Sequence, residues 1–340
     1  MQRFLTLDLE TQRLAMEQAA AAKGLAFVAV EKDFWVCWTL EQLFQLPEIG
    51  GHLTFKGGTS LSKVYGLIDR FSEDIDLVVD KAYLGFSGDR DPEAAPSNAK
   101  RKDLIKALKS TCSEVVSGAI MAALNQAFQG SLPLGRDWSL TMDLEDSDRQ
   151  TILFNYPRLD VVGAGYLRQW VKIELGARSD IDPAQVGTVR SEVALAFPQL
   201  FDQAAVGLRA LDAERTFLEK VTLLHEESFR PSDKPRAQKL ARHYYDVARM
   251  IQKGVGARAL ASRDLFQRVV EHRRIYFKQT WVDYDTMAPG SLRIVPDGAR
   301  MTAWEQDYQA MQREMFYGTP PTWPEVIEEV SRWEDAFNHP

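Results

Sequence analysis

Two glycines and two aspartates in the first quarter of this 340-residue chain have the types and spacing of a phosphate-binding site. Gly57 and Gly58 follow a short apolar run, and Asp74 and Asp76 come shortly afterwards. Adjacent glycines let the backbone approach a phosphate closely, and free amides at a helix start favour its negative charge. Mg²⁺ prefers oxygen ligands and often bridges carboxylates and substrate phosphates. The pattern predicts a phosphate-binding turn beside a divalent-cation site.

The residues around the glycine pair predict the elements that would position it. Apolar side chains alternate over residues 53–55, as in a buried strand that runs into a tight turn. After the turn, apolar residues recur at helical spacing, at Leu61, Val64, Tyr65 and Ile68. We therefore expect a helix whose start is capped by Thr59 or Ser60.

The acidic pair lies in a segment with the period of a strand. Over residues 72–79, Asp74 and Asp76 alternate with apolar residues, so both carboxylates should face the same way, with backbones about 7 Å apart. A lone Gly-Gly is usually a turn, and a lone Asp-x-Asp is usually a solvated strand end. The order of strand, glycine turn, helix and acidic strand is much more specific.

Residues 56–63 and 70–77 resemble the AbiEii/AbiGii toxin family, within the nucleotidyltransferases of the DNA polymerase β type. The resemblance implies an α+β protein, in which a polymerase β-like domain with a mixed sheet flanked by helices precedes a mainly helical domain. It implies Mg²⁺, replaceable by Mn²⁺, and a nucleoside triphosphate as substrate. The implied partners are an RNA acceptor, such as the 3′ end of tRNA, and a cognate antitoxin protein. One departure is that 15 residues separate Gly58 from Asp74, slightly more than in the superfamily pattern.

The resemblance also assigns roles to residues around this motif. Asp74 and Asp76 would be catalytic metal ligands, and the nucleotide would contact Gly57, Gly58, Ser60 and Arg70. A third metal-binding carboxylate normally comes from a neighbouring strand, and Glu174 is our preferred candidate. Residues 170–175 alternate apolar residues with Lys172 and Glu174, which predicts a strand presenting these two on one face. Asp160 and Asp143 are the alternatives.

Two residues of the C-terminal half complete the implied active site. Lys220 would hold the triphosphate, and Asp246 would orient Lys220, a base or an attacking hydroxyl. Structural interpretations stay open: Lys220 could be an ordinary surface lysine, and Asp246 a packing partner of Arg242 or Arg249. His243 occupies a position where many relatives carry an acid, so a second acid in this motif is in doubt.

Length and composition favour two domains, since 340 residues with 45% hydrophobic residues can form two moderate cores. We place them at residues 1–205 and 206–340. Residues 189–196 read as a strand that Phe197-Pro198 interrupts. The C-terminal part reads almost wholly as helices, over residues 212–228, 235–252, 262–278 and 301–316.

The chain has the features of a soluble cytoplasmic protein with no membrane association. Cys37 and Cys112 are the only cysteines, each within a predicted helix, so a disulfide framework is not supported. Charged residues interrupt the N-terminal apolar stretch, which rules out a signal-peptide core, and no run of about 18 apolar residues offers a membrane span.

The net charge of −7 argues against a generic nucleic-acid coat protein, but basic residues cluster locally. One cluster, which could meet RNA or triphosphate, comprises Arg230, Lys234, Arg236, Lys239, Arg242 and Arg249. The other lacks aromatic neighbours and reads equally well as a solvated helix face; it comprises Lys100, Arg101, Lys102, Lys106 and Lys109.

Two further segments of the sequence allow more than one interpretation. Residues 31–40 predict an amphipathic helix that supports the sheet, and Lys32 and Asp33 read as an ion pair at its start rather than as site residues. Large apolar residues near the C-terminus form either core or an antitoxin-binding face: Trp304, Tyr308, Met311, Met315, Phe316, Trp323 and Trp333.

Two other functions remain open, a metal-dependent nuclease and a non-catalytic nucleotide-binding module. Nucleases commonly carry Glu-x-Lys, whereas this chain has Lys172-x-Glu174, which counts against the first.

Overall fold

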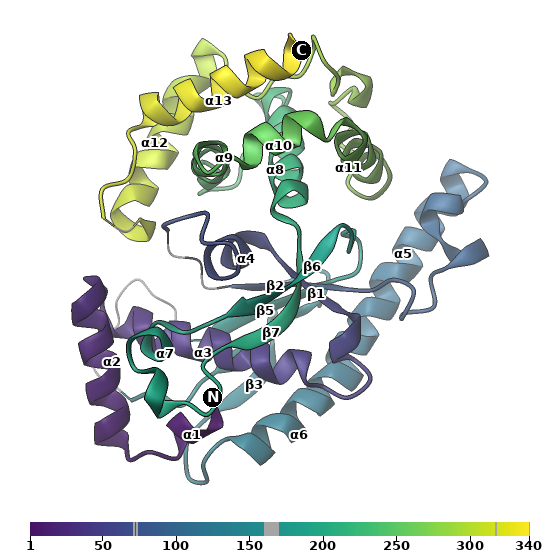
Figure 1. Ribbon diagram of the computed structural model, residues 1–340. Helices are drawn as coiled ribbons and strands as arrows, with labels where there is room; N and C mark the ends of the chain where they lie inside the picture. The colour runs from purple at the N-terminus through teal and green to yellow at the C-terminus, as the bar shows by residue number, and fades with distance from the viewer. Residues whose placement is uncertain (71, 73, 160–169, 317, 340) are drawn as a thin grey trace. The chain divides into compact units, whose positions relative to one another are not determined.

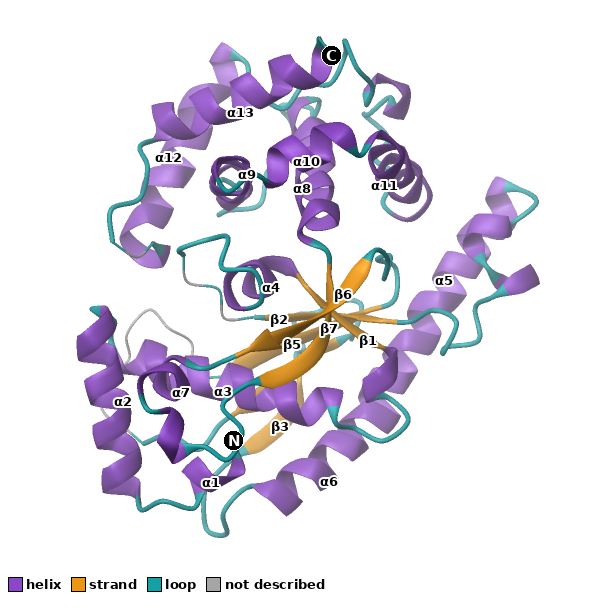
Figure 2. Ribbon diagram, in the orientation of Figure 1, coloured by secondary structure: helices purple, strands orange, loops and turns teal. Residues whose placement is uncertain are grey.

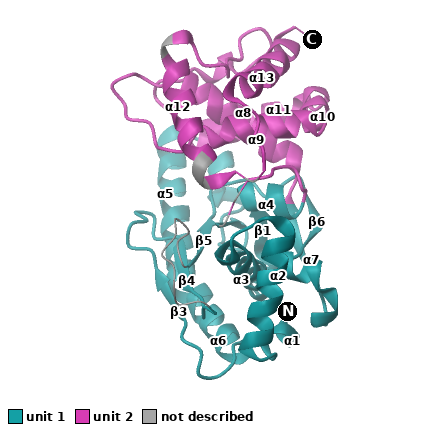
Figure 3. Ribbon diagram, turned by 90° about the vertical axis from the view of Figure 1, so that its left-hand side faces the viewer, with its two compact units in different colours: residues 1–64, 73–210 teal, residues 65–72, 211–340 magenta. Residues whose placement is uncertain are grey.

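The computed structural model describes residues 1–70, 72, 74–159, 170–316 and 318–339. The chain divides into two compact units (Figure 3): residues 1–64 with 73–210, and residues 65–72 with 211–340. Residues 65–72 thus belong to the second unit although they lie between the glycine pair and Asp74 in the chain.

A mixed β-sheet forms the centre of the first unit (Figures 1 and 2). Its described strands are β1 (Leu53–Lys56), β2 (Ile75–Val79), β3 (Ser139–Met142), β4 (Thr151–Asn155), β5 (Val171–Gly176), β6 (Ala184–Val189) and β7 (Val206–Leu211). They lie in the order β3-β4-β5-β2-β1-β7-β6. Strand β2 is antiparallel to β1 and parallel to β5, so the acidic strand lies between the glycine-turn strand and the predicted Glu174 strand.

Helices flank this sheet, which confirms the expected α+β class. They are α1 (Gln2–Leu5), α2 (Leu9–Lys23), α3 (Phe27–Phe44), α4 (Gly57–Lys63), α5 (Asn98–Val115), α6 (Met121–Ser131) and α7 (Glu192–Ala196), with a π-helical turn (Val116–Ile120) between α5 and α6. Trp35 and Trp38 of α3 pack on Phe154 of β4. The Cys112 thiol of α5 donates to the Leu175 carbonyl of β5 at 3.5 Å. Both cysteines are buried in helices, as predicted.

Three local predictions for the first unit were wrong. The helix after the glycine pair ends at Lys63 instead of continuing to Ile68, because Leu67 and Ile68 are buried as part of the second unit. Neither expected side chain caps it: Thr59 donates its hydroxyl to the Asp74 carbonyl at 2.6 Å. The predicted strand over residues 189–196 is mostly α7, whose start is capped by Ser191.

The second unit is helical in its described part, with α8 (Ala213–Ser228), α9 (Arg242–Gln252), α10 (Val255–Ala261), α11 (Arg263–Tyr276), α12 (Gly298–Met315) and α13 (Trp323–Asn338). The C-terminal apolar residues are mainly core, since Trp304, Tyr308, Met311, Trp323 and Trp333 are all buried. None of the helices in the described ranges is both long and apolar enough to span a bilayer.

The helix predicted from residue 235 begins only at Arg242. The preceding residues form a loop because the carboxylate of Asp307 in α12 accepts the amides of Lys239 and Ala241, at 2.7 and 2.8 Å. Lys239 also has a positive φ of 64°, which a helix does not allow.

Candidate active site

A row of charged side chains crosses the middle of the sheet. Lys56 of β1 is in register with Asp76 of β2, and Asp76 is in register with Glu174 of β5. Residues directly opposite each other on neighbouring strands present their side chains on the same face. The sheet therefore brings Asp76 and Glu174 together, with a lysine on the other side of Asp76.

The environment of Asp76 disfavours its charge. Burial and the neighbouring carboxylate of Glu174 raise the pKa of Asp76 to about 7, and Asp74 adds to this effect, while Lys56 opposes it. Two juxtaposed carboxylates repel each other unless a proton or a cation lies between them. The pair is therefore suited to bind a cation.

These residues line a pocket of about 460 Å³ in the first unit. Strands β1, β2 and β5 contribute Lys56, Asp76, Lys172 and Glu174, and the turn between β3 and β4 contributes Asp143, Glu145, Asp146 and Asp148. Lys172 pairs with Glu174 at 2.5 Å, as their shared face predicted. The pocket is mainly acidic and contains two lysines.

Sequence reasoning gave no role to Lys56 or, apart from Asp143 as an alternative metal ligand, to the acidic turn. The Lys56 ammonium donates to the Ser179 hydroxyl at 2.8 Å and lowers the pKa of Asp76 by its charge. In the sequence, the position of Lys56 directly before the glycine pair was the feature that could have indicated its place in the site. The other acids of the turn, Glu145, Asp146 and Asp148, carried no such signal in the sequence; they lie in the connection between the paired strands β3 and β4.

The glycine pair lies against the acidic strand. Gly57 has a φ of 79°, and a Cβ at this position would overlap the carboxylate of Asp76. The hydroxyl of nearby Ser60 is buried without a hydrogen-bond partner among the described residues. The backbone at Gly57 thus approaches the carboxylate as closely as only glycine allows.

Gly57→Ala should displace the Asp76 carboxylate and strain the turn. We expect the free energy of unfolding to fall by about 1–3 kcal/mol, because alanine rarely adopts a positive φ. Chemical denaturation measures this change. Gly51→Ala is the matched control, since a Cβ there meets no atom within 4 Å. Equal stability of the two variants would contradict the close approach.

An ion-pair cluster holds the helix that follows the glycine pair. Lys63, the last residue of α4, pairs with Asp33 of α3 and with Glu192 of α7, the latter at 2.9 Å. The Glu192 amide also donates to Asp33 at 2.6 Å. Burial raises the pKa of Asp33, although Lys63 opposes this. Asp33 therefore joins α3, α4 and α7, rather than pairing within the start of its own helix.

Lys63→Met should lower the free energy of unfolding by about 3 kcal/mol, because it leaves two carboxylates without their shared cation. Lys23→Met is the control, since Lys23 is 55% exposed and contacts Glu192 at 3.4 Å. An exposed pair contributes about 0–1 kcal/mol. Thermal and urea unfolding of both variants compare them, and similar losses would refute the distinction.

The second unit contains the other group of predicted residues. The guanidinium of Arg70 donates two hydrogen bonds to Asp246, at 2.7 and 2.8 Å. The ammonium of Lys220 pairs with the same carboxylate at 2.9 Å. All three residues are buried, so Lys220 is not an ordinary surface lysine. Arg249 pairs with Asp69.

The charges in this group shift one another's protonation. Arg70 and Lys220 hold the pKa of Asp246 well below its usual range despite burial. Burial lowers the pKa of Lys220, although Asp246 opposes this. Burial and the Lys220 charge depress the pKa of His243, whose Nδ1 lies 3.4 Å from the Lys220 ammonium. His243 is therefore neutral and adds no negative charge to this group.

The predicted residues thus form two groups, one in each unit. Asp160, an alternative third carboxylate, lies outside the described residues. Asp143, the other alternative, lines the same pocket as Asp76 and Glu174.

The carboxylate pair fits a divalent cation of the Mg²⁺ type. Within the described ranges, no group of three or more His, Cys, Asp and Glu side chains could enclose a metal ion. Mg²⁺ usually takes only one or two carboxylates from a protein, because waters and substrate phosphates complete its shell. The close approach of Asp76 and Glu174 supplies two.

A mixed sheet with a glycine turn beside paired carboxylates is typical of enzymes that transfer phosphoryl or nucleotidyl groups. Residues 38–339 match the family model described as nucleotidyl transferase AbiEii toxin, type IV toxin–antitoxin system. The chain belongs to this family, so it is a nucleotidyltransferase toxin whose substrate is a nucleoside triphosphate and whose partner is a cognate antitoxin.

Two solved structures are also similar. The nucleotidyltransferase toxin MenT4 from Mycobacterium tuberculosis is 18% identical, with 95% of this chain and 93% of that chain covered and a TM-score of 0.45. JHP933 from Helicobacter pylori is 13% identical, with 91% and 90% covered and a TM-score of 0.39. The search of curated proteins found no match.

Proposed function

We propose that this toxin transfers a nucleotide from a nucleoside triphosphate to the 3′ end of an RNA, namely tRNA, in a Mg²⁺-dependent reaction. The observation that carries the proposal is the row of Lys56, Asp76 and Glu174, with Gly57 against the central carboxylate. Nucleotidyl transfer places negative charge on phosphate oxygens and on the leaving pyrophosphate, so the site must hold both anions and cations.

In this proposal, Asp76 and Glu174 hold the metal directly, and Asp74, the third predicted ligand, adds negative charge beside them. When bound, Mg²⁺ would neutralise phosphate charge and polarise the reacting phosphoryl group. Gly57 and Gly58 provide backbone close to the phosphates, and the buried Ser60 hydroxyl is a donor for a phosphate oxygen. The same ligands would also hold Mn²⁺.

Lys220 and Asp246 take the roles that the family resemblance implies, and Arg70 belongs to the same ion-pair group. Asp246 fixes both cations, and the Lys220 ammonium neutralises charge on the triphosphate. Lys220 has a lowered pKa because it is buried, and its pairing with Asp246 opposes this change. Transfer to tRNA would halt translation, and the antitoxin would restrain it, which explains a toxin that acts in abortive infection.

Incubation with each of the four labelled nucleoside triphosphates and total RNA tests the proposal. We expect label in the tRNA fraction only when Mg²⁺ or Mn²⁺ is present, with chelation abolishing it. Asp74→Ala should abolish both labelling and toxicity on expression. If no RNA is labelled and Asp74→Ala remains toxic, the proposal fails; shortened RNA without added triphosphate would favour the nuclease.

A further inference from the structure

The loop between α8 and α9, together with the first residue of α9, carries a strong local positive charge that the proposed active site does not use. Residues 229–242 contain one acid, Asp233, and five basic residues, in a chain whose net charge is −7. The basic residues are Arg230, Lys234, Arg236, Lys239 and Arg242. Lys234 is exposed, so its charge is presented to solvent.

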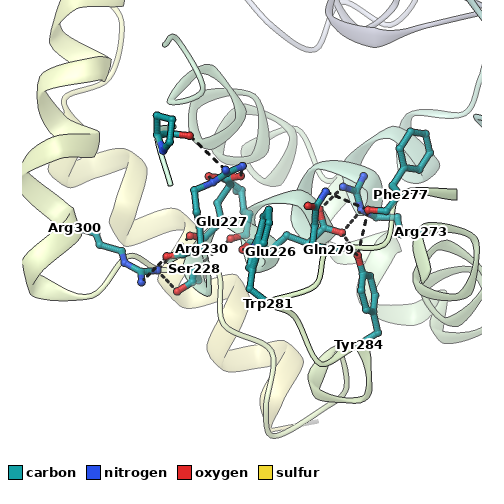
Figure 4. A network of polar contacts seen from close by, with 12 residues as sticks. Glu226, Glu227, Ser228, Arg230, Arg273, Phe277, Gln279, Trp281, Tyr284 and Arg300 are labelled. Atoms are coloured by element: carbon teal, nitrogen blue, oxygen red, sulfur yellow. Dashed lines mark hydrogen bonds and ion pairs between the residues drawn. The ribbon is translucent and has the colours of Figure 1, made fainter. Parts of the chain in front are cut away.

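One face of α12 holds this loop in place. Arg300, Trp304 and Asp307 follow one another at about one-turn intervals along the helix. Arg300 donates to the carbonyls of Glu227, Ser228 and Arg230, where the loop begins (Figure 4). Trp304 lies under the guanidinium of Arg236, at 3.8 Å. Asp307 accepts the amides near the end of the loop. The loop is therefore preorganised.

An aromatic ring lies among the cations. The guanidinium of Arg230 and the ammonium of Lys234 lie 5.1 and 4.2 Å from the centroid of Trp281. The Trp281 indole donates to the Glu226 carbonyl at 3.3 Å, which fixes its edge (Figure 4). The ammonium of a long flexible lysine can move from the ring to a phosphate and leave the ring face to a base.

We infer that this basic loop, residues 229–242 with Trp281, binds a single-stranded segment of the RNA acceptor. Proteins that bind single strands combine cations for the phosphates with aromatic rings on which bases stack. The loop has both, and α12 reduces the conformational entropy that binding would otherwise remove. The inference rests on the proposed function for the identity of the partner.

Binding of a fluorescein-labelled 12-nucleotide RNA, measured by anisotropy from 50 to 300 mM salt, tests the inference. Each lost phosphate contact lowers the salt slope by about 0.7 for single strands. For Lys234→Gln/Lys239→Gln we expect a slope lower by about 1.4 and affinity about tenfold weaker at 0.15 M salt. Lys100→Gln/Lys102→Gln is the control, because it removes equal charge from exposed positions of α5.

Trp281→Leu separates stacking from charge. It should weaken single-strand binding without changing the salt slope, and should leave binding of a 12-base-pair RNA duplex unchanged. Wild-type affinity and slope in the lysine variant, or an equal loss in the α5 control, would overturn the inference. So would loss of antitoxin binding with RNA binding intact, because the loop would then be a protein interface.

Labelling assays on the same proteins distinguish this result from failure of the proposed function. If wild type labels RNA while the loop variants bind RNA normally, only the docking surface is wrong. If wild type labels no RNA, the proposed function is wrong whatever the binding data.

Discussion

Asp76→Asn should lower the rate of nucleotidyl transfer by about three orders of magnitude, because a lost metal ligand removes several kcal/mol of charge stabilisation. The same variant should be more stable than wild type at neutral pH in the absence of Mg²⁺. Its amide no longer repels Glu174, and we expect a gain of about 1–2 kcal/mol in the free energy of unfolding. Single-turnover transfer and urea unfolding measure the two effects.

Matched variants locate the remaining ligands. Asp80→Asn is the control, since Asp80 follows the other end of β2 and accepts the Ala82 amide at 2.8 Å. Glu174→Gln should reproduce the activity loss of Asp76→Asn, whereas Asp143→Asn should have a much smaller effect. If Glu174→Gln remains active and Asp143→Asn is inactive, Asp143 rather than Glu174 is the metal ligand.

Asp246→Ala should lower the free energy of unfolding by about 3–5 kcal/mol, because it leaves two buried cations without their shared carboxylate. Asp69→Ala is the control in the same unit: its side chain is 53% exposed and pairs with Arg249, so we expect a loss below about 1 kcal/mol. Chemical denaturation measures both. Similar losses would show that the buried carboxylate has no special structural role.

The pH dependence of this difference has a definite sign. Because the pKa of Asp246 in the folded protein is below its usual range, its contribution is complete above about pH 4. The contribution is lost only as the pH falls further, through the folded-state pKa. The gap between wild type and Asp246→Ala should therefore be constant from pH 8 to about pH 5.

Lys220→Met separates structure from catalysis in the same group. Arg70 keeps its two hydrogen bonds to Asp246, so the variant should fold, while the KM for the triphosphate should rise at least about tenfold. Steady-state kinetics with varied triphosphate tests this. An unchanged KM together with a marked loss of stability would make Lys220 a structural residue.

Strand periodicity allowed the faces of β2 and β5 to be predicted, but not their pairing. Alternation in residues 170–175 placed Lys172 and Glu174 on one face of β5, as their ion pair confirms. In residues 72–79 only Asp76 lies within β2, which begins at Ile75, so the common face of Asp74 and Asp76 stays a prediction. The register that puts Asp76 beside Glu174 depends on the whole sheet, which no local pattern reports. Their role as metal ligands stays a prediction.

The local predictions failed where distant contacts decide backbone conformation. Residues 235–241 have a helical pattern, yet Asp307 holds two of their amides from about 70 positions away. Similarly, Ile68 has helical spacing from the glycine turn, but it is buried as part of the other unit. Side-chain bonds to the backbone and unit membership both override propensity.

The passage of residues 65–72 into the second unit limits how this toxin can be recombined. A polypeptide ending at residue 210 would keep the glycine turn and the acidic strand but lack Asp246, the partner of Arg70. A chimaera joined at a single point near residue 210 would match the Arg70 segment of one parent to the helices of another. A functional exchange of helical units therefore needs three junctions rather than one, after residues 64, 72 and 210.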